Sequence, residues 1–281
     1  MPELPEVEIT ARLLGGAVSG ARISSALAPG VNALKSFDPP LAALEGRLIE
    51  AVRRRGKLLL IEVEGDLTVL VHLMSAGRLQ LFDKQASLRD RTSRVLLRLD
   101  DGRELRLREF GTKQRAWAKI TPSATVMEEE TIAALGPDAW PAPPPFGPPL
   151  DAPRPLHGLL RDQRVIAGIG RSWVDEILHG AQQSPFKRGS ELDEEEAERL
   201  REETITRLGA AIDHYERTLS LPIPDKLPMP LTVHRRRGEP CPRCGLGLEA
   251  VFYEDYVMCY CPACQTGGKL LKDRRLSRLL K

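Results

Sequence analysis

The first apolar residues of the chain recur at the spacing of an α-helix. Val7, Ala11 and Leu14 fall on one helical face. Pro5 precedes them at a position where the first helical turn accepts a proline, and the glycine pair at 15–16 is typical of a helix end. The N-terminus is therefore predicted to lead directly into a packed helix.

The pattern from residue 58 to residue 110 changes to that of strands. LLLIEVEG and LTVLVHL are short apolar runs, and in RVLLRLDDGRELRLREF apolar positions alternate with others. The Asp-Gly pair at 101–102 predicts a hairpin turn, and Leu105 and Leu107 continue the alternation beyond it. We expect an antiparallel sheet, arranged as a sandwich, whose alternate arginines share one face and meet either a polyanion or water.

A proline-rich segment, PDAWPAPPPFGPPLDAPRP, follows the strands. Its prolines are expected to prevent both helix and sheet pairing, so it is predicted to be a domain boundary. Beyond it the sequence becomes helical and ends in a long helix that should begin near Ser190, with Asp193 as a capping-box partner. The buried stripe of that helix is predicted to be Ala197, Leu200, Thr204, Leu208, Ala211 and Tyr215.

Length and composition indicate a globular chain of two domains, with room for a small appendage. The chain has 281 residues, of which 42% are hydrophobic and 28% are charged. No apolar run reaches the 18 or so residues of a membrane span, and MPELPEVE lacks the features of a signal peptide. We therefore expect a cytoplasmic protein, in a bacterial cytoplasm or nucleoid, without a membrane partner.

The net charge of +2 conceals strong local differences. Residues 191–203 hold eight acids against two arginines, whereas 89–119 and 235–281 each hold ten Lys or Arg against five acids. Such basic regions can bind phosphates, although charge runs are more often solvated surface. Charge alone therefore does not identify a nucleic-acid partner.

Four of the five cysteines form two closely spaced pairs. CPRC at 241–244 and CPAC at 261–264 are separated by 16 residues, a spacing typical of one tetrahedral zinc site with four thiolates and no open position. The metal ligands would be Cys241, Cys244, Cys261 and Cys264, and the zinc would be structural. A cluster without metal and a pair of disulfides are the alternatives, and Cys259 is interpreted as a spare thiol.

Two further stretches can carry chemistry. In IAGIGRSW, Gly168 and Gly170 allow backbone amides to approach an anion at the start of the next helix, although a glycine turn is more often structural. Removal of Met1 would leave Pro2 as an N-terminal secondary amine, of which a substantial fraction is unprotonated and nucleophilic near neutral pH. Glu3 could then move protons. The alternative is that Pro2 and Pro5 only stiffen the terminus.

The motifs MPELPEVE, VRRRGKLLLIE, HLMSAGRL, LREFG, IAGIGRSWVDEIL and RRRGEPCPRCG follow in this order along nearly the whole chain. Together they resemble the formamidopyrimidine-DNA glycosylase and endonuclease VIII family. The resemblance implies an α+β fold, in which an N-terminal antiparallel β-sandwich flanked by helices precedes a helix-two-turns-helix domain with a zinc-finger hairpin. The expected parts are a catalytic domain at 1–135, a proline-rich linker at 136–155, a DNA-binding domain at 156–230, and a zinc finger with a basic tail at 231–281.

The resemblance also implies roles for single residues. Pro2 would be the Schiff-base nucleophile, Glu3 the acid-base residue, and Lys57 a phosphate contact that is also assigned proton donation. Arg108 and Phe110 match a loop that fills the gap left by a flipped base, although Phe110 in an ordinary core is an equal alternative. The partner would be damaged double-stranded DNA, bound by a monomer with one structural zinc ion.

Several positions depart from the family pattern. Met74 and Ser75 stand where the family has glycine and a wedge methionine, and Glu109 is expected to face phosphate in place of a cation. Arg171 replaces a phosphate-binding asparagine beside Gly168 and Gly170, and Tyr256 replaces a phosphate-gripping arginine. The connection ERTLSLPIPDKLPMPLTVHRRRGEP also lacks the Gly-Thr-rich loop of guanine-lesion enzymes.

These features favour a bifunctional DNA glycosylase and AP lyase of base excision repair with an altered lesion preference, for which 8-oxoguanine is not the expected substrate. The elimination would be β, or β followed by δ. A damaged-DNA-binding protein that kept the scaffold and lost turnover is the first alternative. A zinc-ribbon interaction protein without DNA contact is the second.

Overall fold

The computed structural model describes residues 1–281 except Val31, Thr112, Glu254 and 273–281, so the end of the basic tail lies outside the described residues. The chain forms two compact units, one of residues 1–134 with 212–228 and the other of residues 135–211 with 229–281. No helix in the described part of the chain is long and apolar enough to cross a membrane.

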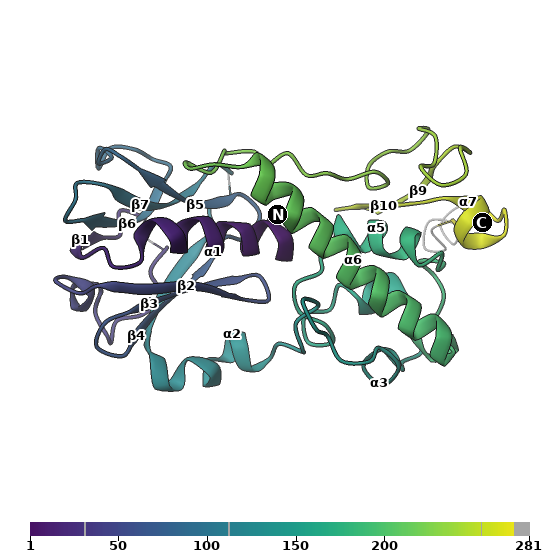
Figure 1. The fold of residues 1–281 in the computed structure, drawn as a ribbon, viewed down its shortest axis with the longest axis horizontal. Helices are drawn as coiled ribbons and strands as arrows, with labels where there is room; N and C mark the ends of the chain where they lie inside the picture. Colours follow the sequence, from purple (N-terminus) through teal and green to yellow (C-terminus); the bar gives the residue numbers. More distant parts are fainter. Residues whose placement is uncertain (31, 112, 254, 273–281) are drawn as a thin grey trace. The chain divides into compact units, whose positions relative to one another are not determined.

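The first unit is a β-sandwich of two antiparallel four-stranded sheets (Figure 1). One sheet has the order β1 (Ile23–Leu27), β6 (Ser93–Leu99), β7 (Glu104–Glu109) and β5 (Gly77–Phe82). The other has the order β2 (Ile49–Arg55), β3 (Leu58–Val63), β4 (Leu67–His72) and β8 (Trp117–Pro122). The predicted turn at 101–102 joins β6 to β7, which confirms the antiparallel sandwich.

Helix α1 (Leu4–Val18) runs alongside the strands of this unit (Figure 1). Val7, Ala11 and Leu14 are all buried in the core that the two sheets share, as their spacing predicts. The short elements η1 (Leu41–Leu44), η2 (Ser123–Glu128) and α2 (Glu130–Ala133) complete residues 1–134.

Residues 212–228 return to the first unit and complete its core. Ile223 and Leu227 are buried among the residues of the sandwich core. The Gln80 side-chain amide donates hydrogen bonds to the Ile223 carbonyl oxygen and to the Asp225 carboxylate. This segment is therefore part of the sandwich, although about 80 residues of the other unit precede it in the chain.

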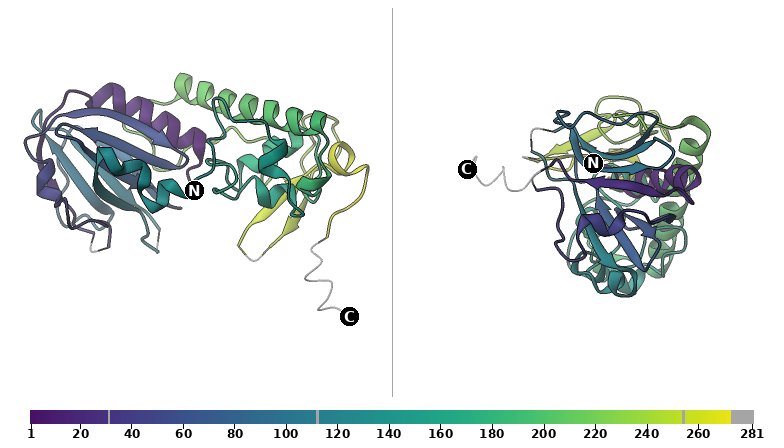
Figure 2. Two further views of the ribbon diagram at one scale, coloured as in Figure 1. Left: turned by 90° about the horizontal axis from the view of Figure 1, so that it is seen from below. Right: turned by 90° about the vertical axis from the view of Figure 1, so that its left-hand side faces the viewer.

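The regular secondary structure of the second unit is mainly helical. It contains α3 (Gly147–Leu150), α4 (Leu156–Leu159), α5 (Trp173–Gly180), η3 (Gly189–Glu191), α7 (Pro262–Thr266) and the larger part of α6 (Glu194–Thr218). Strands β9 (Glu249–Phe252) and β10 (Val257–Tyr260) pair as an antiparallel hairpin, drawn in yellow in Figure 2.

The proline-rich stretch before α4 packs against its own unit. Ala139, Phe146 and Leu150 are almost completely buried, and α3 lies within the stretch. The expectation that its prolines would prevent any helix was wrong, because prolines in the first turn of α3 occupy positions whose N–H groups have no helical partner.

Helix α6 carries the predicted buried stripe but begins later than expected. All six predicted stripe residues are buried. The helix starts at Glu194, because the Asp193 carboxylate accepts the Glu196 N–H at 2.8 Å while the Glu196 carboxylate accepts the Asp193 N–H at 3.1 Å. Ser190 instead lies in the separate turn η3. Asp193 is thus the cap itself.

Candidate functional site

The N-terminal residues are fixed in the first unit by the start of helix α1. Pro2 is buried, and Glu3 is only 2% exposed at the capping position. The Glu3 side chain accepts a backbone N–H of the first turn, and the Glu6 carboxylate accepts the Glu3 N–H at 2.8 Å. This reciprocal capping box holds the terminus in place, whereas chain ends are usually frayed.

A tyrosine from the far end of the sequence completes this arrangement. The Tyr215 hydroxyl donates to the second oxygen of the Glu6 carboxylate at 2.8 Å. Burial, together with the nearby Glu6, raises the pKa of Tyr215, so the phenol stays protonated and remains a donor. Sequence reasoning missed this contact, because Glu6 and Tyr215 are 209 residues apart and no local pattern relates them.

The terminal amine lies in surroundings that favour its neutral form. Burial lowers the pKa of the Met1 amine, and the charges of Arg78 and Lys57 lower it further, while Glu3 and Glu6 oppose the change. The predicted acid-base residue Glu3 and the predicted lysine Lys57 therefore both lie close enough to influence the Met1 amine electrostatically. A neutral amine is the nucleophilic form.

Lys57 is buried, with 8% of its surface exposed, which excludes an ordinary exposed lysine at a strand end. It immediately precedes β3, whose first residue, Leu58, pairs with His72 of β4. Burial lowers the pKa of His72 to about 4, and the positive charge of Lys57 contributes. His72 is thus a neutral ring beside Lys57, and it was not among the predicted site residues although it begins the motif HLMSAGRL.

The turn after β4 presents the two residues that depart from the family pattern. His72 Nδ1 accepts the Met74 N–H at 2.9 Å, so the ring proton resides on Nε2. Met74 has a φ of 49°, a left-handed conformation that is unusual for a residue with a side chain, and Ser75 is exposed. The histidine therefore fastens a strained turn.

Arg108 and Phe110 lie together at the end of β7. The Arg108 guanidinium lies 4.6 Å from the centre of the Phe110 ring, and its Nη1 is 3.3 Å from the Asp225 carboxylate. Phe110 is 40% exposed, which excludes the interpretation that it belongs to an ordinary core. An exposed aromatic ring beside a guanidinium is suited to stacking on a base.

Glu109 does not face a phosphate, and that expectation was wrong. Its side chain is buried, and its two carboxylate oxygens accept the Arg115 and Ala116 N–H groups at 2.8 and 3.0 Å. Arg94 lies 3.8 Å from it. Because successive strand residues point to opposite faces, Glu109 points inward while its neighbours Arg108 and Phe110 do not.

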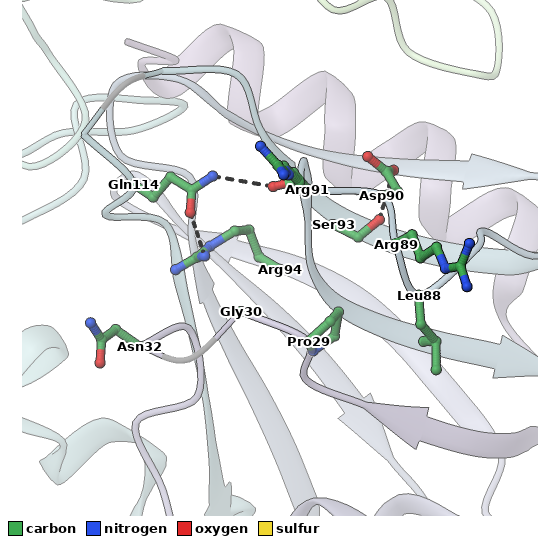
Figure 3. A pocket seen from close by; sticks show the side chains of 10 residues that line it. All are labelled: Pro29, Gly30, Asn32, Leu88, Arg89, Asp90, Arg91, Ser93, Arg94 and Gln114. Carbon is green, nitrogen blue, oxygen red and sulfur yellow. Dashed lines mark hydrogen bonds between the residues drawn. The ribbon is translucent and has the colours of Figure 1, made fainter.

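The basic region at 89–119 divides into internal and surface charges. Arg98 and Arg106 both pair with the buried carboxylate of Glu104, so these arginines of alternate positions balance an internal charge. Near the Arg94 side chain, a surface cavity of about 470 Å³ is lined by Pro29, Gly30, Asn32, Leu88, Arg89, Asp90, Arg91, Ser93, Arg94 and Gln114 (Figure 3).

The cavity carries a surplus of positive charge. The Asp90 carboxylate is already occupied by hydrogen bonds from Thr92 and from the Ser93 hydroxyl. The Gln114 side chain joins Arg94 Nη1 to the Arg91 carbonyl oxygen, as the dashed lines in Figure 3 show. The cavity therefore places three arginines of this basic region, Arg89, Arg91 and Arg94, around one concave surface of the first unit.

The glycine turn belongs to the second unit and leads into helix α5. Gly168 has a φ of 108°, which requires glycine, and its N–H donates to the Gln163 side chain at 3.0 Å. The same amide side chain donates to the Ile169 carbonyl oxygen at 2.8 Å and to the Arg161 carbonyl oxygen at 2.9 Å. The Gly168 amide expected to meet an anion is thus engaged within the protein.

Tyr256 lies in an aromatic and cationic cluster of the same unit. Its ring stacks on Tyr253 with centroids 4.3 Å apart and on His157 at 5.7 Å. The guanidinium groups of Arg161 and Arg171 lie 4.3 and 5.3 Å from its centre. The structure therefore brings Arg171 and Tyr256 together and adds Arg161, which sequence reasoning missed because no motif contains it.

The four predicted cysteines form a cluster suited to a metal ion. Their sulfur atoms lie within 4.8 Å of one another, with Cys241 to Cys264 at 4.0 Å and Cys244 to Cys261 at 3.5 Å. Tetrahedral zinc with Zn–S bonds of about 2.3 Å places its sulfurs roughly 3.8 Å apart, which these distances fit. Cys259 lies outside the cluster, and its sulfur accepts the Arg235 N–H.

Two buried acids of helix α5 fasten the segments that lead to this cluster. The Glu176 carboxylate accepts three consecutive backbone N–H groups, from residues 232 to 234. The Asp175 carboxylate accepts the Cys259 N–H at 2.9 Å and lies 2.6 Å from His234 Nδ1. Sequence reasoning missed both acids, since it interpreted only the glycines and the arginine of that motif.

Comparison with known proteins gives one consistent result. Residues 1–113 match the sequence model of the Formamidopyrimidine-DNA glycosylase N-terminal domain, and residues 151–222 match that of the Formamidopyrimidine-DNA glycosylase H2TH domain. The formamidopyrimidine-DNA glycosylase of Bacillus cereus is 32% identical, over 94% of this chain and 99% of the relative. That of Thermus thermophilus is 33% identical, over 95% of this chain and all of the relative.

Solved structures agree with the sequence matches. The Fpg protein of Lactococcus lactis, in complex with DNA containing N7-benzyl-Fapy-dG, has a TM-score of 0.84 and 25% identity over 94% of this chain and all of its own. The Fpg protein of Thermus thermophilus has a TM-score of 0.81 and 32% identity over 96% of this chain and all of its own.

Proposed function

Because this chain belongs to the formamidopyrimidine-DNA glycosylase family, we propose that it is a DNA glycosylase and AP lyase of base excision repair that acts through the amine of Pro2. One observation carries the catalytic part of this proposal. Burial, Arg78 and Lys57 lower the pKa of the Met1 amine, although the buried carboxylates of Glu3 and Glu6 oppose the change, and we propose that the Pro2 amine exposed by removal of Met1 has the same neighbours.

The proposed reaction begins when removal of Met1 exposes the secondary amine of Pro2. Its nitrogen forms a bond to the anomeric carbon of the damaged nucleotide, the bond to the base breaks, and the base leaves with a proton. The sugar ring then opens, because the bond between the anomeric carbon and the ring oxygen breaks and that oxygen takes up a proton, which leaves a cationic iminium between the proline nitrogen and the anomeric carbon. The iminium draws electrons from the neighbouring carbon, so loss of a proton there forms a double bond and expels the 3′ phosphate. Glu3 is the group that moves protons, because it directly follows the nucleophile.

Lys57 and the turn after β4 are proposed to hold the nucleotide. Lys57 is a buried lysine beside the neutral ring of His72, so its ammonium group can bind a phosphate oxygen in place of a water molecule. We propose that the space left by the flipped base is filled by four side chains, those of Arg108, Phe110, Met74 and Ser75. The exposed ring of Phe110 with Arg108 over it supports this role.

In the second unit we propose one structural zinc ion on the four clustered cysteines, with DNA phosphates bound near Gly168, Gly170, Arg171 and Tyr256. Zinc would contribute folding energy there, since a site of four thiolates keeps no open position for chemistry. The solved Lactococcus lactis relatives are complexes with damaged DNA, which supports a damaged duplex as the partner.

We propose a preferred lesion other than 8-oxoguanine. Residues 219–228, which lie in the first half of the connection that lacks the Gly-Thr-rich sequence, are bound to the first unit through the buried Ile223 and Leu227 and through the hydrogen bonds from Gln80. A segment held in this way cannot also serve as a mobile cover over a flipped base. Efficient excision of 8-oxoguanine from a duplex would overturn this part.

Borohydride trapping on a duplex with one abasic site tests the mechanism. The mature protein should form a covalent cross-link, while a version with an uncleaved N-terminal tag should not, because its amine is blocked. Pro2→Gly should cross-link far more slowly, and Pro5→Ala is the matched control because it removes a proline of the same helix start without changing the amine. No cross-link from the mature protein would refute the Schiff base, and retained damage-specific binding would then favour the non-catalytic alternative.

A further inference from the structure

We propose that Arg161 and Arg171, laid on the ring of Tyr256, form a two-arginine clamp for one internucleotide phosphate, in which Arg161 is the principal ligand. The inference rests on the proposed function, because it assigns a ligand in the DNA to the second unit. All the residues that carry it lie within that unit.

The tyrosine is a platform and not itself a phosphate ligand. Its ring is fixed by stacking on Tyr253 with an interplanar angle of 11° and on His157 with one of 12°. Tyr253 also donates its N–H to the Tyr256 carbonyl oxygen at 2.9 Å, which closes the turn between β9 and β10. A ring held in this way offers a fixed, electron-rich face to cations.

Arg161 uses this face. Its guanidinium carbon lies 4.3 Å from the ring centre, well within the distance for a cation–π interaction. A cation–π interaction uses the charge of a guanidinium and does not consume its N–H groups, which are the donors that a phosphate accepts. Among the described residues, no carboxylate forms an ion pair with Arg161, so a bound phosphate would not have to displace one from this guanidinium.

The backbone of Arg161 is fixed to the glycine turn. The Gln163 side chain bonds to the Arg161 carbonyl oxygen, to Gly168 N–H and to the Ile169 carbonyl oxygen. These three bonds hold the backbone of Arg161 close to the turn that precedes helix α5. The side chain therefore starts from a rigid position, which lowers the entropy lost on binding.

Arg171 is the second member and is held by an exposed acid. Its Nη1 donates to the Asp255 carbonyl oxygen at 2.6 Å, and its Nη2 pairs with the Asp255 carboxylate. That carboxylate is 67% exposed and lies beside the platform, where it competes with a phosphate for the same guanidinium. The structure thus contains both guanidinium groups of the clamp, and the negative charge of Asp255 is the group that competes with a phosphate for Arg171.

The test is equilibrium binding to a fluorescent duplex that contains a tetrahydrofuran abasic analogue, which cannot form a Schiff base, over a series of KCl concentrations. Arg161→Ala should weaken binding roughly tenfold or more, as expected for a charge-assisted bond, and should reduce the slope of log K against log salt by about 0.9. Arg164→Ala is the matched control. Arg164 is an exposed neighbour paired with Asp162, and its loss should change affinity by less than about twofold.

Variants of the other members separate platform from ligand. Tyr256→Phe keeps the ring and should bind like the wild type, whereas Tyr256→Leu should weaken binding roughly threefold to tenfold without changing zinc content. Asp255→Asn should tighten binding, because it removes the competing charge. Weaker binding by Asp255→Asn would overturn the assignment of Arg171.

The outcomes distinguish this clamp from the proposed reaction. If Arg161→Ala matches Arg164→Ala in affinity and in salt slope, the clamp is refuted even when the wild type forms a borohydride cross-link. If Tyr256→Leu binds like the wild type, the platform is refuted. If the wild type does not cross-link while Arg161→Ala still loses affinity and salt dependence, the clamp stands and the proposed lyase reaction falls.

Discussion

Replacing Tyr215 by phenylalanine removes one oxygen atom from the buried network beneath the N-terminus. The hydroxyl is the donor to Glu6, whose other oxygen holds the Glu3 N–H. Tyr215 and Glu6 are 0% and 1% exposed, so water does not replace the lost donor without rearrangement. The change should therefore lower both the stability of the first unit and the rate of the proposed reaction at Pro2.

The size of the stability loss follows from the partner's charge. A hydrogen bond to an ionised group contributes about 1.5–3 kcal/mol, so Tyr215→Phe should cost about 2 kcal/mol of unfolding free energy. With a urea m-value of about 2 kcal/mol per molar, the unfolding midpoint should fall by about 1 M. Looser placement of Glu3 should slow borohydride trapping by roughly threefold to tenfold.

Urea unfolding and single-turnover trapping on an abasic duplex measure the two effects. Tyr260→Phe is the matched control, because Tyr260 is equally buried but its hydroxyl accepts the Leu271 N–H, a neutral donor. The control should lose only about 1 kcal/mol and trap at the wild-type rate. A Tyr215→Phe protein with the wild-type urea midpoint would refute the reasoning, and an unchanged trapping rate would show that Glu6 does not position the nucleophile.

Three further changes test other parts of the molecule. The pKa of His72 is about 4 in the folded chain and about 6.5 in the unfolded chain, so between these pH values only the unfolded chain binds the proton. The free energy of unfolding should therefore fall by about 3 kcal/mol as the pH drops from 6.5 to 4. Urea titrations of His72→Gln over the same pH range should lack this His72-dependent loss. Gly77→Ala places a carbon 2.4 Å from the Leu73 carbonyl oxygen and should lower the free energy of unfolding by about 1–3 kcal/mol. Gly16→Ala meets no atom within 4 Å and should stabilise helix α1 by about 0.5–1 kcal/mol. Equal thermal unfolding midpoints for the two variants would contradict this reasoning. Chelation should release the metal of the cysteine cluster and abolish duplex binding in anisotropy, and full binding without metal would exclude a structural role.

The sequence predicted what depends on neighbours in the chain. The buried positions of α1 and α6 follow from helical spacing, the β6–β7 hairpin follows from its Asp-Gly turn, and the cysteine cluster follows from ligand spacing. Each of these signals is complete within one or two dozen residues. They were sufficient for the sandwich, the helical unit and the clustering of the four cysteines.

The contacts that prepare the site could not be predicted in this way. Tyr215 reaches Glu6 across 209 residues, and Arg161 acquires its meaning only beside Tyr256, which lies almost a hundred residues later. Glu109 is different, because strand alternation alone shows that it points away from Arg108 and Phe110, and its inward direction was within reach of the sequence. The error there was to place a residue by its motif instead of by its strand.

The first unit is made of two pieces of chain, and this affects how a new molecule is completed during synthesis. A ribosome releases residues 1–134 well before residues 212–228, which supply Tyr215 and the buried Ile223. Until then Glu6 lacks its hydroxyl donor and the Gln80 amide lacks its backbone acceptor. The hydrogen-bond network beneath the terminal amine therefore stays incomplete until about four fifths of the residues have been joined. The proposed nucleophile is among the first residues synthesised, but the contacts beneath it form among the last.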